Sequence, residues 1–123
     1  MGGEKLEVGI RSYEDLEVYQ ESFRLAVKIH KLTQSLPAEE KRELGYQMRR
    51  AAVSIPANIA EGYGRKNSSA EFKHFLRNAL GSSNEVSVLL KLAKELLYID
   101  DGKIIEEYDA LGKRIYRLIE SWE

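Results

Sequence analysis

The chain of 123 residues has no cysteine, only two prolines and no long run of apolar side chains. Without cysteine it can form neither a disulfide framework nor a thiolate metal site, and it suits a reducing compartment such as the cytoplasm. The start, MGGEKLEVG, lacks the basic and apolar segments of a secretory signal. No stretch approaches the ~18 apolar residues of a membrane span. We therefore expect a single soluble, cytoplasmic domain.

A strong net charge is also missing, because the total is -1. The charges are unevenly distributed, however. Residues 41–77 hold eight basic and three acidic residues, a local charge of +5, so the rest of the chain carries -6. Such a segment can attract a polyanion although the whole chain is nearly neutral. The small total argues against strong nucleic-acid binding by a monomer.

The first half of the chain predicts two helices. SYED, with Ser12 and Asp15, has the pattern of a capping box and predicts a helix from Ser12 to about residue 35. This helix has two apolar stripes, more than one core contact needs: Leu16, Tyr19, Phe23 and Ala26, and Leu25, Ile29, Leu32 and Leu36. The second helix follows the turn LPAEEK, with Pro37 in its first turn. It is expected to end at Gly62 and Gly64 through a left-handed residue.

The second half predicts two more helices. Ser68 and Glu71 form another capping-box pattern. Apolar and small residues then recur every 3.5 positions, which favours packing against antiparallel neighbours: Phe72, Leu76, Ala79, Ser83, Val86, Leu90, Ala93 and Leu97. A fourth helix begins near Asp100 and repeats the rhythm to Trp122. The expected fold is an all-α, up-down-up-down antiparallel four-helix bundle over residues 12–123, after a loose tail at 1–11.

The second predicted helix contains a proline. Pro56 removes a hydrogen bond to the carbonyl of Ala52 and costs ~3 kcal/mol inside a helix. Two interpretations remain open. The proline bends the helix to follow the bundle and packing compensates, or it opens a concave site beside the free carbonyl.

Polar residues at helical spacing line the same helix and the next one. They form a candidate structural polar network: Gln47, Arg50, Ser54, Asn58, Glu61, Asn78, Ser82 and Glu85. If the two lines face each other, Arg50 can pair with Glu85 or Glu61. Such a network sets register and partner geometry more than stability. The alternative is a ligand or catalytic site.

The sequence contains no complete motif for a catalytic or a metal site. Glu71 and His74 have the spacing of a di-iron helix, but that site needs the motif twice, and the only other histidine, His30, has no glutamate three residues before it. No nucleophile with a base and no phosphate loop is evident. We expect no enzyme, no metal and no cofactor.

Four stretches together resemble a known family: EDLEVYQESFRLAVKIHKLT, the turn LP, LGYQMRRAAVSIPANIAEGYGR and EFKHFLRNALGSSNEVSVLL. The chain is similar to the four-helix bundle proteins of 23S ribosomal RNA intervening sequences. The resemblance implies an up-down bundle that assembles as a homopentameric ring with a central channel. Related bundles are accessory proteins of diversity-generating retroelements, where they bind nucleic acid and a reverse transcriptase.

The leading hypothesis is therefore a non-enzymatic, oligomeric, nucleic-acid-associated protein, acting on structured RNA or beside a reverse transcriptase. Five basic residues are the candidates for phosphate contact to RNA or DNA: Arg49, Arg65, Lys66, Lys73 and Arg77. The alternative is a protein-interaction scaffold that binds no nucleic acid.

Overall fold

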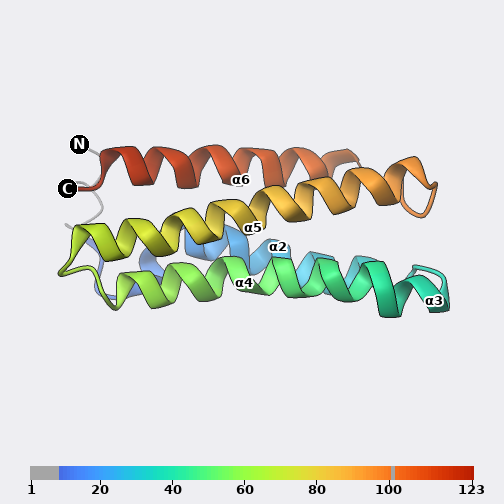
Figure 1. Cartoon of the computed structure of the whole chain (residues 1–123), viewed down its shortest axis with the longest axis horizontal. Coiled ribbons are helices and arrows are strands. Elements are labelled where there is room, and N and C mark those ends of the chain that lie inside the picture. The colour runs from blue at the N-terminus through green and yellow to red at the C-terminus, as the bar shows by residue number, and fades with distance from the viewer. Residues whose placement is uncertain (1–8, 101) are drawn as a thin grey trace.

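The computed structural model of the chain describes residues 9–100 and 102–123. Four long helices are α2 (Glu17–Thr33), α4 (Tyr46–Tyr63), α5 (Ser69–Glu95) and α6 (Gly102–Ser121). Each runs opposite to the one before it (Figure 1). Helix α2 packs on α4 and α6, and α5 also packs on α4 and α6, so α2 and α5 are diagonal partners. The predicted all-α four-helix bundle is confirmed for the single chain, and the described residues include no strand.

The start of the first helix differs from the prediction. Ser12 and Asp15 do form a capping box, but it heads a single 3₁₀ turn, Tyr13–Asp15. Leu16 follows in an extended conformation (ψ 130°) and is fully buried, so α2 begins only at Glu17. The continuous helix expected from Ser12 is wrong, because placing Leu16 in the core takes the backbone off the helical path.

The expected loose tail falls mostly on residues 1–8, which lie outside the described residues. Ile10 packs against the core. The amide of Arg11 donates to the Asp15 carboxylate at 2.8 Å. Residues 10 and 11 therefore lie against the bundle.

The second helix is interrupted near its start. After α3 (Ala38–Glu40), residues Lys41–Gly45 form a π-helical turn that leads directly into α4. A Cβ on Gly45 would lie 3.0 Å from Nη1 of Arg49 and 3.3 Å from Leu36. The π turn thus brings the backbone close to the Arg49 guanidinium, and an added Cβ would have to displace that side chain by a few tenths of an ångström.

The other end of this helix does not close as predicted. No glycine among the described residues has a positive φ, and Gly64 caps α4 with φ -63°. Gly62 instead serves close packing. An added Cβ would lie 2.7 Å from the Cβ of Phe75 on α5. Gly62 therefore lets α4 and α5 approach each other just before the turn between them.

Helix α5 confirms the 3.5-residue pattern for all but the last of its predicted positions. Seven are buried: Phe72, Leu76, Ala79, Ser83, Val86, Leu90 and Ala93. Leu97 is wrong as a core position, because α5 ends at Glu95 and Leu97 is 88% exposed with φ 64°. The amide of Tyr98 donates to the carbonyl of Ala93 at 2.9 Å, which closes the helix end around this left-handed residue.

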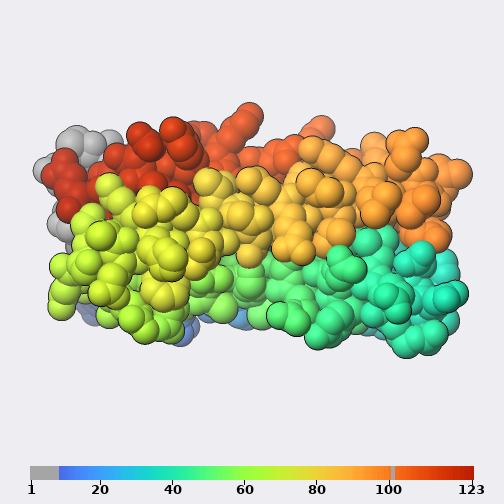
Figure 2. Space-filling view, in the orientation of Figure 1, coloured from blue at the N-terminus to red at the C-terminus, as the bar shows by residue number. Residues whose placement is uncertain are grey.

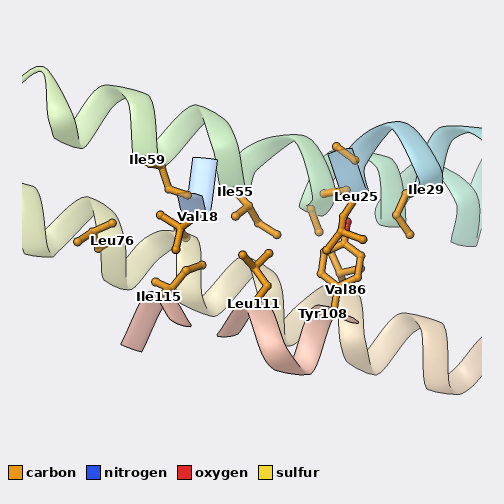
Figure 3. Packing of buried hydrophobic residues seen from close by; sticks show 14 of the residues in the cluster. Val18, Leu25, Ile29, Ile55, Ile59, Leu76, Val86, Tyr108, Leu111 and Ile115 are labelled. Carbon is orange, nitrogen blue, oxygen red and sulfur yellow. The ribbon is translucent and has the colours of Figure 1, made fainter. Parts of the chain in front are cut away.

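The core runs along the whole bundle, and Figure 3 shows side chains from α2, α4, α5 and α6 meeting in it. Tyr108 of α6 is 1% exposed, and its hydroxyl has no hydrogen-bond partner. Burial raises the pKa of this phenol well above 10.0. A buried donor without a partner costs free energy, so the Tyr108 hydroxyl is unfavourable although its ring packs in the core.

Pro56 lies inside the continuous α4 and is buried, and the Ala52 side chain is fully buried as well. The polar side chains that flank Pro56 in α4 donate to backbone carbonyls of the same helix. Asn58 donates to the Ser54 carbonyl at 2.7 Å, and the Ser54 hydroxyl donates to the Ala51 carbonyl at 3.2 Å. Burial of the proline fits the interpretation in which tertiary packing compensates for its cost.

Candidate nucleic-acid interface

The two predicted polar lines meet at one point. Helices α4 and α5 form a complete face of the bundle (Figure 2). Across their junction the hydroxyls of Ser54 and Ser82 are hydrogen-bonded to each other. Ser54, Asn58 and Ser82 are half-buried. These three residues form the packed part of the predicted network.

The other members of the network are exposed in the single chain: Gln47, Arg50, Glu61, Asn78 and Glu85. Arg50 lies over the ring of Tyr46, 5.8 Å from its centroid, and donates to its hydroxyl at 3.5 Å. The ion pair of Arg50 with Glu85 or Glu61, which the spacing allows, does not form. Glu61 pairs with Arg65 instead, since the two are one helical turn apart.

Arg49 does not belong to an exposed basic surface. Its guanidinium donates to the Thr33 hydroxyl at 3.1 Å and to the Lys41 carbonyl at 3.3 Å. Thr33 is fully buried, and Arg49 is half-buried. Arg49 therefore ties α4 to α2 and to the π turn. It also lies 16 residues before Arg65, about 24 Å along the helix.

Arg65 and Lys66 lie at the turn between α4 and α5. Arg65 pairs with Glu61 at 2.9 Å and with Glu71 at 3.3 Å, and these hydrogen bonds raise its pKa above the ordinary value. Lys66 is exposed and its ammonium lies 4.9 Å from the ring centroid of Tyr63. Arg65 has two carboxylates beside it, so it offers a phosphate less net charge than its side chain suggests.

Lys73 and Arg77 lie on helix α5 itself and not at the turn that holds Arg65 and Lys66. They share one face of α5 with Leu80 and Asn84, because the steps between the four are four, three and four residues. Leu80 and Asn84 line a shallow groove of about 550 Å³ between α5 and α6. We call it the α5/α6 groove; its lining is Leu80, Asn84, Asp109, Gly112, Lys113, Tyr116 and Arg117.

The sequence interpretation missed the contribution of α6 to this surface. Lys113, Tyr116 and Arg117 lie within the stretch GKRIYRL at steps of three and one. A helical projection of that stretch would have placed them near one another. Only the pairing of α6 with α5 shows that they adjoin the line of Lys73 and Arg77.

The charges of the groove are mostly unpaired. Within residues 9–100 and 102–123, ion pairs join Arg24, Lys28 and Arg65 to glutamates, and none of these three basic residues lines the groove. The one acid in the groove, Asp109, accepts a hydrogen bond from the Ser87 hydroxyl at 2.7 Å. Lys113 and Arg117 in the groove form no ion pair with a described residue, and neither do Lys73 and Arg77 on the α5 face that also carries Leu80 and Asn84. These four residues leave their charge available to an anion.

Metal chemistry finds no site in the described part of the chain, where no three acidic or histidine side chains gather to hold an ion. Glu71 binds Arg65, and His74 lies against the ring of Phe75 at 5.4 Å. In the same residues no helix combines the length and apolar character needed to cross a membrane.

Fold and surface together define a small all-α bundle with a basic groove along one helix pair. The chain belongs to the family of the 23S rRNA-intervening sequence protein, whose family model matches residues 14–121. This match confirms the family indicated by the sequence stretches in α2, α4 and α5. No curated protein matches the chain.

Proposed function

We propose that the chain is a non-enzymatic protein that associates with nucleic acid through the α5/α6 groove. The observation that carries the proposal is the run of four basic side chains without acidic partners, Lys73, Arg77, Lys113 and Arg117, along one helix pair. Lysine and arginine on phosphates supply most sequence-independent affinity for nucleic acid. The name of the family, 23S rRNA-intervening sequence protein, supports RNA as the nucleic acid.

The proposed active form is a ring of several copies, five by resemblance to the family. Two exposed apolar patches on diagonal helices support this assembly. Phe23 and Val27 lie on α2, and Val88, Leu92 and Leu96 follow one line of α5. Because the patches differ and lie on different helices, patch-to-patch contact is head-to-tail and can close into a ring. A ring multiplies the basic groove although each chain is nearly neutral.

A protein-interaction scaffold is the second candidate. It is favoured by the α4/α5 face, where Arg50 and Glu85 are exposed without an ion pair and Tyr46 is half exposed. Such a face fits another protein, for which a reverse transcriptase is the candidate. Retention of a protein partner after nuclease treatment would favour this function over the first.

The test is binding of a labelled RNA oligonucleotide as salt is raised. We expect binding at low salt, and the logarithm of the binding constant should fall linearly with the logarithm of the salt concentration. The double variant Lys113→Glu with Arg117→Glu should abolish it, and Arg65→Glu with Lys66→Glu should weaken it less, because Arg65 is already paired. The matched control, Lys91→Glu with Lys94→Glu, makes the same charge change on α5, at two exposed lysines that do not line the groove.

Two results would overturn this function: no detectable binding at low salt, or equal losses in the groove variant and the control. The latter would mean that total charge and not the groove decides binding. Light scattering tests the ring separately. A strict monomer, unaffected by Leu92→Asp, would remove the assembly from the proposal.

A further inference from the structure

Among the residues that the structure describes, three tyrosine or phenylalanine side chains are at least half exposed, and one of them has no ring or cation beside it. Phe23 (53% exposed) lies 5.9 Å from the ring of Tyr19, and Tyr46 (50% exposed) is covered by Arg50. Tyr116 (54% exposed) contacts no other ring and no cation among the described residues. An exposed tyrosine ring offers a ligand a flat apolar face together with a polar tip.

Tyr116 also occupies a specific place, within the lining of the α5/α6 groove. Arg117 precedes the buried Leu118 on the same helix, and Lys113 lies one turn back. Asn84 lies across the groove on α5, with an amide that can donate and accept. Two cations on α6, at positions 113 and 117, thus line the same groove as the Tyr116 ring, together with a hydrogen-bonding amide from α5.

This arrangement distinguishes unpaired from paired nucleotides. A duplex presents its phosphates outward and keeps its base faces stacked inside, so a side chain on a shallow surface meets only backbone. A single strand can turn a base onto an aromatic ring while its phosphates contact neighbouring cations. Every base has a face that can stack, so such recognition tolerates any sequence.

We infer that Tyr116 is a nucleobase-stacking residue and that the α5/α6 groove selects single-stranded over double-stranded nucleic acid. This inference rests on the proposed nucleic-acid function and adds its ligand class, an unpaired nucleotide. Lys113 and Arg117 hold the flanking phosphates, and the Asn84 amide faces the edge of the stacked base.

The experiment compares three probes of equal charge per strand by fluorescence anisotropy: oligoadenylate, the same backbone with abasic sites, and a duplex of matched length. The wild-type chain should bind oligoadenylate roughly five-fold or more tighter than the abasic strand, which is the low end of one stacked base. Tyr116→Ala should erase that difference while leaving the salt slope unchanged, because no phosphate contact is lost. Tyr116→Phe should retain it, since the ring remains.

The matched control is Tyr46→Ala, which removes an equally exposed tyrosine from α4 and should leave the preference intact. Circular dichroism of each variant establishes that the bundle is folded. Equal binding of abasic and normal strands by the wild-type chain overturns the inference but leaves the nucleic-acid function standing, and so does a preference that survives Tyr116→Ala. Failure to bind any probe at low salt overturns both, as does equally tight binding of an oligoglutamate of the same charge.

Discussion

The guanidinium of Arg49 on α4 donates a 3.1 Å hydrogen bond to the buried hydroxyl of Thr33 on α2. It also reaches the Lys41 carbonyl in the π turn at 3.3 Å. One side chain therefore joins two helices and the irregular turn that precedes α4. This placement separates Arg49 from the other basic residues that the sequence suggested for phosphate contact.

Replacing Arg49 should affect stability more than binding. Arg49→Ala removes two hydrogen bonds from a charged donor, although the Thr33 hydroxyl keeps its bond to the His30 carbonyl, so the free energy of unfolding should fall by about 1–3 kcal/mol. Urea denaturation measures this change. Arg42→Ala is the control at an exposed position of the same segment and should stay within about 0.5 kcal/mol of wild type. Unchanged stability with weakened RNA binding would return Arg49 to the nucleic-acid surface.

Removing the hydroxyl of Tyr108 should stabilise the bundle. The oxygen is buried without a partner, so Tyr108→Phe keeps the ring in the core and removes an unsatisfied polar atom. We expect a gain of about 1 kcal/mol in the free energy of unfolding. Tyr108→Ala, by contrast, should lose about 3–5 kcal/mol through the cavity it leaves. If the phenylalanine variant is less stable than wild type, the hydroxyl has a partner in solution.

Two glycines in the bundle should respond to alanine in opposite ways. At Gly62 the new Cβ would lie 2.7 Å from the Cβ of Phe75, so Gly62→Ala must separate α4 from α5 and should cost about 1–3 kcal/mol. At Gly81, in the middle of α5, a Cβ meets nothing within 4 Å, and Gly81→Ala should stabilise the helix by about 1 kcal/mol. Thermal melts of the pair check both signs. A neutral Gly62→Ala would contradict the close packing.

The seam between α2 and α6 should weaken in acid. Burial raises the pKa of Glu107, but hydrogen bonds from Arg24 and Lys28 outweigh it and hold the pKa below the ordinary 4.5. A carboxylate with a lower pKa in the folded state stabilises the fold above its unfolded pKa, and this contribution is lost as the pH falls through the folded pKa. Wild type should therefore exceed Glu107→Gln in stability at neutral pH.

Urea midpoints across the acid range measure this difference, which should shrink steadily below pH 4.5. The exposed Glu106→Gln serves as the control on the same helix and should follow wild type at every pH. A gap between wild type and Glu107→Gln that does not change with pH would show that packing, and not the ion pairs, accounts for it.

What the sequence determined by itself is the helical architecture. The 3.5-residue recurrence in α5 places Phe72, Leu76 and Val86 in the core, because a helix presents residues at that spacing to one side whatever its neighbours are. The Ser68 cap behaves in the same way: its hydroxyl accepts from the Glu71 amide at 3.2 Å, a contact within a single turn of chain. Local geometry suffices for features of this kind.

Only the tertiary structure decided which basic side chains are free to contact an anion and where the helices begin and end. Leu97 fits the heptad but lies past the end of α5, and Leu16 leaves the helix to reach the core. Arg49 and Arg77 are both helical arginines of the basic segment, yet Arg49 is bonded to Thr33 of α2 and Arg77 is exposed on α5. Partners more than a turn away come from packing between helices, and a single helix pattern contains no information about them.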